Sequence, residues 1–146
     1  MFSKGGSSAG GLRALSLILG VFFIFMGISK IDWLTSDAFL MGRFQEWLET
    51  APAASRWFLQ TLAIPGAPLF SRIVPIAEMA AGAAMVCGFK VRLAAALSLL
   101  MVLTFHFASD VLFHYSYLTN GYGLPVVSGL VALGIGGGKL PFSVSK

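Results

Sequence analysis

Four long apolar blocks constrain this sequence more than any other feature. They cover residues 12–31, 73–89, 93–114 and 122–138. A transmembrane helix needs roughly 17–25 mainly apolar residues, and each block has about that length. The chain of 146 residues is 57% hydrophobic and only 11% charged, which is about half the charged share of a soluble domain. The sequence therefore predicts an all-α membrane protein with four transmembrane helices in a bundle.

The segments outside the blocks predict a tail and a lid. Residues 1–11 are rich in Gly and Ser and are expected to form a flexible N-terminal tail, so that residues 12–146 form a single transmembrane domain. Residues 32–68 contain all three tryptophans together with acidic and basic side chains. Short amphipathic helices of this composition suit the plane of the membrane interface. We expect such interfacial helices at residues 32–68, with the prolines at 52, 65 and 68 delimiting them.

The distribution of basic residues predicts an orientation. Four spans would place both termini on one side of the membrane, and six of the ten Lys and Arg residues would then lie on that side. Cytoplasmic segments carry the excess of Lys and Arg, so both termini are expected in the cytoplasm of a multi-pass protein of the cell inner (cytoplasmic) membrane. The net charge of +4 comes from basic residues scattered beside apolar blocks. We therefore expect a lipid bilayer and no nucleic acid as the partner, and the single cysteine excludes an internal disulfide.

The embedded ionisable residues are the candidate site. His106, Asp110 and His114 are spaced i, i+4 along the third block, which as one helix would place them on one stripe. The predicted topology brings Lys30, Glu78, His106 and Asp110 together in the outer half of the membrane. Charges there are costly unless they are paired or used.

Three interpretations of this convergence stay open. The residues could form an internal salt-bridge and hydrogen-bond network, a polar pocket beneath the lid, or a contact with a partner subunit. Histidine can donate to a quinone carbonyl or ligate a tetrapyrrole. A quinone is therefore a candidate cofactor and a tetrapyrrole pigment a weaker one, with none bound covalently. The two histidines would lie about 12 Å apart on one helix, so no metal site is predicted.

Several short segments resemble the DoxX family. They are GVFFIFMGISK at residues 20–30, PIAEMAAG at 75–82, CGFKVRLAA at 87–95, and the closing helix at 120–138. The resemblance implies a four-helix membrane protein associated with quinone-linked redox systems, including the small subunits of thiosulfate:quinone oxidoreductase. It marks Lys30, Glu78 and Arg92 as the positions carried over. The long segment 32–68 and the His106/Asp110/His114 stripe depart from the family pattern.

The functional expectation combines the residues with this resemblance. We expect an accessory subunit of a membrane redox or electron-transfer complex, which stabilises the assembly and lines a quinone or lipid pocket on the outer side. One alternative is a quinone-reactive oxidoreductase subunit similar to that of thiosulfate:quinone oxidoreductase, and another is a pigment- or lipid-binding scaffold subunit of a photosynthetic or respiratory complex. The sequence contains no self-sufficient catalytic motif, which favours a non-catalytic subunit.

Overall fold

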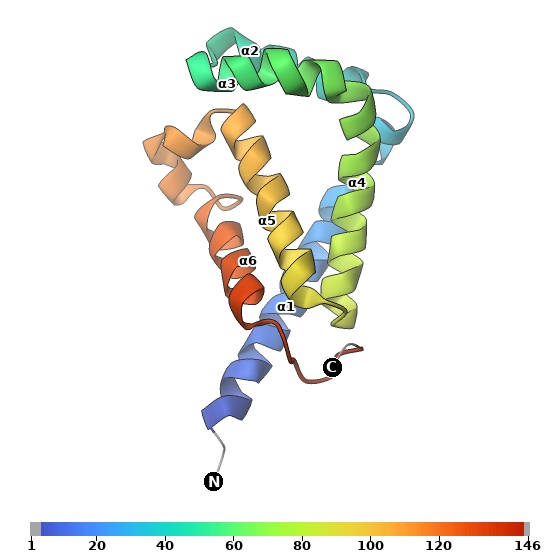
Figure 1. Cartoon of the computed structure of the whole chain (residues 1–146), viewed down its shortest axis with the longest axis vertical. Coiled ribbons are helices and arrows are strands. Elements are labelled where there is room, and N and C mark those ends of the chain that lie inside the picture. Colours follow the sequence, from blue (N-terminus) through green and yellow to red (C-terminus); the bar gives the residue numbers. More distant parts are fainter. Residues whose placement is uncertain (1–3, 145–146) are drawn as a thin grey trace.

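The computed structural model describes residues 4–144, where the chain forms helices joined by short turns and no strand occurs (Figure 1). Side chains are described from residue 8 onward. The elements are α1 (Lys4–Ile28), η1 (Ile31–Leu34), α2 (Ala38–Thr50), α3 (Ala53–Phe58), η2 (Leu59–Ala63), α4 (Ile64–Cys87), α5 (Val91–Ala108), η3 (Val111–Phe113), η4 (Tyr115–Thr119) and α6 (Leu124–Gly136).

Three helical segments are long and apolar enough to cross a membrane. They are Ser8–Ile28, Ala53–Cys87 and Val91–Ala108, and they make the chain a multi-pass membrane protein. The fourth predicted span, residues 122–138, contains α6, which is apolar but has only 13 residues. At 1.5 Å per residue α6 is about 20 Å long, shorter than a hydrocarbon core of about 30 Å. The crossing of α6 therefore stays a prediction.

The four long helices form a closed arrangement that is covered at one end. Helix α1 packs against α4 and α6, and α5 packs against the same two helices. Helices α2 and α3 lie across one end of this bundle, which we call the covered end (Figure 1). The start of α1 and the end of α6 lie at the opposite end. A helical layer thus exists where the lid was expected, while its place in a membrane interface stays a prediction.

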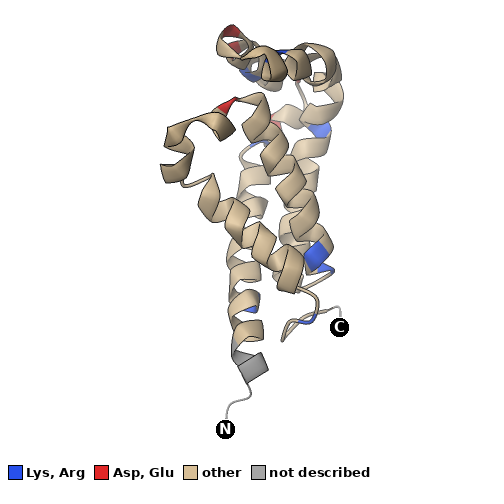
Figure 2. Ribbon diagram, turned by 60° about the vertical axis from the view of Figure 1, so that its left-hand side comes forward, with Lys and Arg blue, Asp and Glu red and all other residues tan. Residues whose placement is uncertain are grey.

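The end that holds both termini is basic. Figure 2 shows Lys and Arg there, whereas Asp and Glu lie toward the covered end. The six acidic residues of the chain are Asp32, Asp37, Glu46, Glu49, Glu78 and Asp110. We call the opposite end the basic end, and its described basic residues are Arg13, Lys90, Arg92 and Lys139.

Two boundaries differ from the sequence prediction. The expected flexible tail of residues 1–11 is helical from Lys4, and residues 1–3 lie outside the described range. The Gly- and Ser-rich stretch contains no proline, so the helix of the apolar block can continue into it. The helical segment that contains the second predicted span is longer than expected, because the chain is helical from Ala53 to Cys87, and the start of the span within it stays a prediction.

The prolines expected to end the lid instead lie at a bend. Pro65 occupies the first turn of α4, where a backbone N–H is not needed for the helix, and Pro68 follows within the helix. The residues just before them, Leu59–Ala63, form a π-helical turn. Prolines and π-turns are common causes of sharp helix bends. The chain turns in this region from the covering layer into α4 (Figure 1).

Helices α1 and α4 make the closest contact in the bundle. A β-carbon added at Gly82 would lie 2.6 Å from the carbonyl oxygen of Gly20, and one added at Gly27 would lie 2.8 Å from the carbonyl oxygen of Pro75. Such distances are too short for any side chain, so glycine is what lets the two backbones touch. We call this contact the α1–α4 seam.

The seam is tied at the basic end by Arg13. This side chain is buried, with 8% exposed, and donates hydrogen bonds to the carbonyl oxygens of Met85 at 2.9 Å and Val86 at 2.7 Å. Both carbonyls belong to the last turn of α4, where backbone acceptors lack helical partners and a cation is favourable. Arg13 therefore caps the C-terminal end of α4 and also holds α1 against α4.

Candidate functional site

At the other end of the seam, an ion pair between Lys30 and Glu78 joins α1 to α4. The Lys30 Nζ atom lies 2.8 Å from Oε2 and 3.0 Å from Oε1 of Glu78, and these side chains are only 15% and 8% exposed. Lys30 also donates to the carbonyl oxygen of Met26 at 3.1 Å. It lies just past the end of α1, whereas Glu78 projects from α4. An ion pair between these two residues is one form of the internal network that the sequence left open.

The predicted stripe on the third block is wrong, because α5 ends at Ala108. Asp110 has a φ of 61°, in the left-handed region. A short aspartate side chain tolerates that conformation better than most residues do, so Asp110 suits the turn that redirects the chain. His106 therefore stays on α5, while Asp110 and His114 follow the turn. These two still form a pair, with His114 Nε2 3.0 Å from Asp110 Oδ2.

His106 has a partner that the sequence analysis did not identify. Its Nδ1 atom lies 2.9 Å from the hydroxyl of Tyr117, and the two rings meet edge to face with centroids 5.3 Å apart. Tyr117 is buried in η4, and this burial raises the pKa of its phenol. The aromatic loop at residues 115–123 was the available signal, since a buried tyrosine hydroxyl usually needs a hydrogen-bond partner.

The four predicted site residues therefore form separate pairs. No hydrogen bond or ion pair joins Lys30 and Glu78 to His106 or Asp110 among the described residues. Each side chain is bonded within its own pair. The arrangement matches the internal-network interpretation locally, at three places rather than one.

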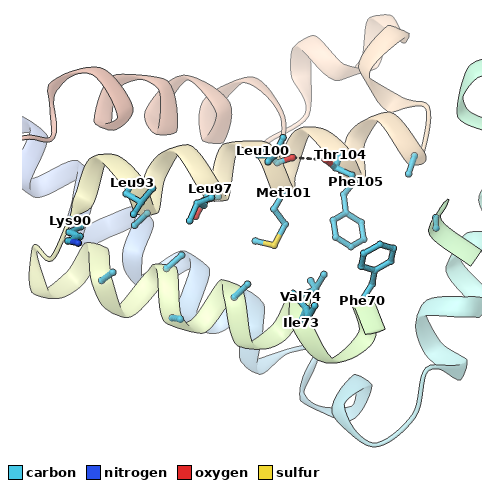
Figure 3. Close-up of a pocket in the computed structure, with 18 of the residues that line it drawn as sticks. Phe70, Ile73, Val74, Lys90, Leu93, Leu97, Leu100, Met101, Thr104 and Phe105 are labelled. Atoms are coloured by element: carbon cyan, nitrogen blue, oxygen red, sulfur yellow. Dashed lines mark hydrogen bonds between the residues drawn. The ribbon is translucent and has the colours of Figure 1, made fainter. Parts of the chain in front are cut away.

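A large hollow lies elsewhere, between α4 and α5, and holds about 600 Å³. Figure 3 shows it running along both helices. We call it the α4–α5 groove. One wall is formed by small residues of α4 and the other by larger apolar residues of α5, and none of the four predicted site residues lines it. The α4 residues with small side chains are Ala77, Ala80, Ala81 and Ala84, and the α5 wall includes Leu93, Leu97, Leu100 and Met101.

The two ends of the groove differ in chemistry. Aromatic rings close the covered end, where α2, α3, α4 and α5 each contribute one. Lys90 lies at the opposite end, in the turn between α4 and α5 (Figure 3). The rings belong to Phe44, Phe58, Phe70 and Phe105.

The tight turn at the basic end explains the shape of the groove. Gly88 and Lys90 both have left-handed backbones, with φ values of 72° and 42°. Gly88 is the common helix-ending residue in this conformation. The turn holds α4 and α5 together at this end, and Figure 1 shows the two helices diverging toward the covered end. Phe89 and Leu93, beside the turn, are about half exposed at the groove.

Ser98 is a buried polar residue of the groove wall, which also includes Thr104 and Lys90. It is 1% exposed, and its hydroxyl has no hydrogen-bond partner among the described residues. A buried hydroxyl without a partner costs stability unless a ligand supplies one. The groove therefore fits a long apolar molecule and offers one hydroxyl to a polar atom on it. A quinone and a lipid each have these properties, because each joins a long apolar tail to a part that carries oxygen atoms.

The comparison with known proteins agrees with the sequence motifs. Residues 11–114 match the family model described as DoxX. The matched range contains α4, α5 and most of α1, together with the covering layer and all four predicted site residues. No curated protein and no solved structure matches the chain.

Proposed function

Because this chain belongs to the DoxX family, whose members are usually membrane proteins with redox- or quinone-related functions, we propose that it is an accessory subunit of a membrane redox complex. In this role it stabilises the assembly through its helix faces and carries no reaction centre of its own. We further propose that the α4–α5 groove holds a quinone or a lipid. This places the pocket between α4 and α5 instead of around the predicted polar residues.

One observation supports the non-catalytic role above the others. The ionisable side chains proposed as a site are bonded to one another or to Tyr117, at distances of 2.8–3.0 Å. A general acid or base must reach its substrate within hydrogen-bond distance. Here the same groups hold α1 to α4 and fix the segment after α5. Their positions suit helix attachment better than proton transfer to a bound molecule.

Exposed apolar side chains supply surface for neighbours within the membrane. On α1 these include Ile18 and Phe25, which are 68% and 65% exposed, and on α6 Ile135 is 75% exposed. In a bilayer such residues contact either lipid or other helices. Helix association there depends on packing rather than on a hydrophobic drive.

Purification tests the accessory role. The tagged full chain would be extracted in a mild detergent and separated on a native gel, with an unrelated tagged membrane protein of the same cell as the control. We expect a redox subunit to co-migrate with the chain and not with the control. Migration of the chain alone, with no co-purifying redox protein, would contradict the proposal.

The orientation is proposed from the basic end. Lys and Arg lie close to the ends of the spans there, whereas the acidic residues lie toward the covered end, so we infer from the positive-inside rule that this end is in the cytoplasm. Cys87 is the one cysteine of the chain, lies at the end of α4 and is exposed. A membrane-impermeant maleimide should therefore label Cys87 only after the cells are permeabilised.

A matched variant with its cysteine at the covered end should give the opposite labelling result. Gly42 is exposed in α2, and a side chain added there meets nothing within 4 Å. The double substitution Cys87→Ser, Gly42→Cys should be labelled in intact cells, because it moves the thiol to the covered end. Labelling of Cys87 in intact cells would reverse the proposed orientation.

A further inference from the structure

The connection between α5 and α6 exposes large apolar side chains. We call residues 111–122 the aromatic segment, which contains η3 and η4 and stands out from the side of the bundle below the covering layer (Figure 1). Its side chains Phe113, Tyr115, Leu118 and Tyr122 are 74%, 84%, 57% and 61% exposed. The segment contains no Lys, Arg, Asp or Glu. Exposed apolar surface of this kind marks a contact with a membrane or with another protein.

Helix η4 separates the apolar side chains of this segment from polar ones. A 3₁₀-helix has three residues per turn, so residues three apart lie on the same face. Tyr115 and Leu118 share one exposed face, and Ser116 and Thr119 share the next, which is also exposed. Tyr117 lies on the third face and is buried. Helix η4 is therefore amphipathic on its outer side, as are helices that lie in a membrane interface.

The backbone of the aromatic segment is hydrogen-bonded within itself. A succession of N–H groups donates to the carbonyl oxygen three residues earlier, at 2.9–3.2 Å, and these bonds join Val111, His114, Tyr117, Asn120 and Gly123 in turn. The histidine and the buried tyrosine also have side-chain partners. Backbone groups inside a bilayer must be bonded by the protein, because the lipid chains offer no partner. The segment meets this condition along these bonds.

A hydrogen bond at the basic end sets the depth of the segment. Arg92, in the first turn of α5, donates from Nε to the carbonyl oxygen of Gly134, in the last turn of α6, at 3.1 Å. The start of α5 and the end of α6 are therefore level. From there the 18 residues of α5 extend about 27 Å and the 13 residues of α6 about 20 Å. Because a hydrocarbon core is about 30 Å thick, the start of α6 falls below its boundary at the covered end.

We propose that the aromatic segment is embedded in the leaflet at the covered end. Tyr115 and Leu118 contact acyl chains, and Ser116 and Thr119 face the head groups. The partner of this surface is thus the lipid at the boundary between acyl chains and head groups, where tyrosine fits because its ring is apolar and its hydroxyl polar. The segment fills the distance that the short helix α6 leaves. The proposal depends neither on the accessory role nor on which side of the membrane the covered end faces.

Spin labelling of the full chain in lipid nanodiscs tests this placement. Cys87→Ser removes the single cysteine, and Leu118→Cys or Thr119→Cys then adds one labelling site. Oxygen dissolves among acyl chains, whereas a polar nickel chelate stays in water, so the collision rates of the label with the two reagents give its depth. We expect the label at residue 118 to lie about 5–10 Å into the boundary between head groups and acyl chains. The label at residue 119, on the polar face, should lie nearer to the water.

Reference labels calibrate the two environments. Ile18→Cys lies near the middle of the span Ser8–Ile28, where Ile18 is 68% exposed, and should meet oxygen but not nickel. Gly42→Cys, exposed in α2, should meet nickel. Tyr115→Cys repeats the measurement on the apolar face of η4, so a folding defect of one variant does not decide the result. Gel filtration against Cys87→Ser alone identifies such a defect.

Two results would overturn the proposal. Nickel access at residue 118 equal to that of Gly42→Cys would place the segment in water, as expected for a surface that binds a soluble partner. Shielding of residue 118 from both reagents would show that another protein chain covers it. Co-purification of a redox subunit is measured separately, so a failed accessory role and a failed lipid contact give different results.

Discussion

The two faces of helix α4 pack against their neighbouring helices at very different distances. One face forms the α1–α4 seam, where Gly82 meets Gly20 so closely that no β-carbon fits. The other face carries alanines and faces α5 across a groove of about 600 Å³. Both faces include small residues. Small residues therefore permit a close contact but do not by themselves produce one.

The residues of the neighbouring helix, together with hydrogen bonds and ion pairs, decide which face of α4 packs closely. Across the seam, glycine faces glycine, and Arg13 and Lys30 fix α1 to opposite parts of α4. Across the groove, the alanines face larger side chains of α5, and the tight turn after Gly88 holds the helices together at one end only. The seam is thus a structural contact, and the groove is left as space for a ligand.

The largest effect on stability should come from breaking the ion pair between Lys30 and Glu78, toward the covered end of the seam. Lys30→Met leaves the Glu78 carboxylate without its partner in a place where it is 8% exposed. Removal of one member of a buried pair costs about 3–5 kcal/mol of the free energy of unfolding. Denaturant titration in detergent micelles would measure this loss.

A double substitution shows whether the loss comes from the stranded charge. In Lys30→Met, Glu78→Gln both charges are gone, so much of the stability should return. Arg43→Gln breaks an exposed ion pair and should cost less than about 1 kcal/mol. A Lys30→Met variant no less stable than Arg43→Gln would show that the seam does not depend on this tie.

The next largest effect should come from adding bulk inside the seam. Gly82→Ala places a β-carbon 2.6 Å from a backbone oxygen of α1, so the helices must separate. Overpacking of this kind costs about 1–3 kcal/mol. Gly134→Ala in α6 is the control, because a β-carbon there meets nothing within 4 Å. Equal unfolding midpoints for the two variants would contradict the close contact.

The sequence was informative about α1 and α4 because their signals are strong. The apolar blocks predicted multi-pass membrane helices. An ion pair between Lys30 and Glu78 was one form of the internal network that the sequence left open, since a lysine at the end of one span and a glutamate near the start of the next fall at similar depth. Those inferences needed only the length and order of the helices.

The sequence was misleading where a local turn decided the outcome. An apolar run continues past Ala108, yet Asp110 adopts a left-handed conformation and ends the helix there. Hydropathy does not register one residue's φ angle, so the stripe from His106 to His114 was predicted on a helix that stops halfway. The groove could not be predicted either, because it depends on how far α5 diverges from α4.

A substitution at the groove wall should have a smaller effect on the free energy of unfolding and should raise it. Ser98→Ala removes a buried hydroxyl that has no partner among the described residues. Burial of an unpaired hydroxyl costs about 1–3 kcal/mol, so in lipid-free micelles the variant should be about 1 kcal/mol more stable. Added quinone or lipid should reduce this gain if one of its oxygen atoms accepts the hydroxyl's hydrogen bond. A destabilised Ser98→Ala would show that the hydroxyl has a role within the fold.

The smallest effect on stability should come from Ala80→Phe. This change adds more bulk than Gly82→Ala and lies half a turn away on the same helix, but it projects into the groove. Since the groove has room for the ring and no backbone opposes it, the free energy of unfolding should change by no more than about 0.5 kcal/mol. Thermal unfolding of the two variants side by side would measure the difference. A loss as large as that of Gly82→Ala would mean that α5 packs against α4 as closely as α1 does, and the groove would then not be available to any ligand.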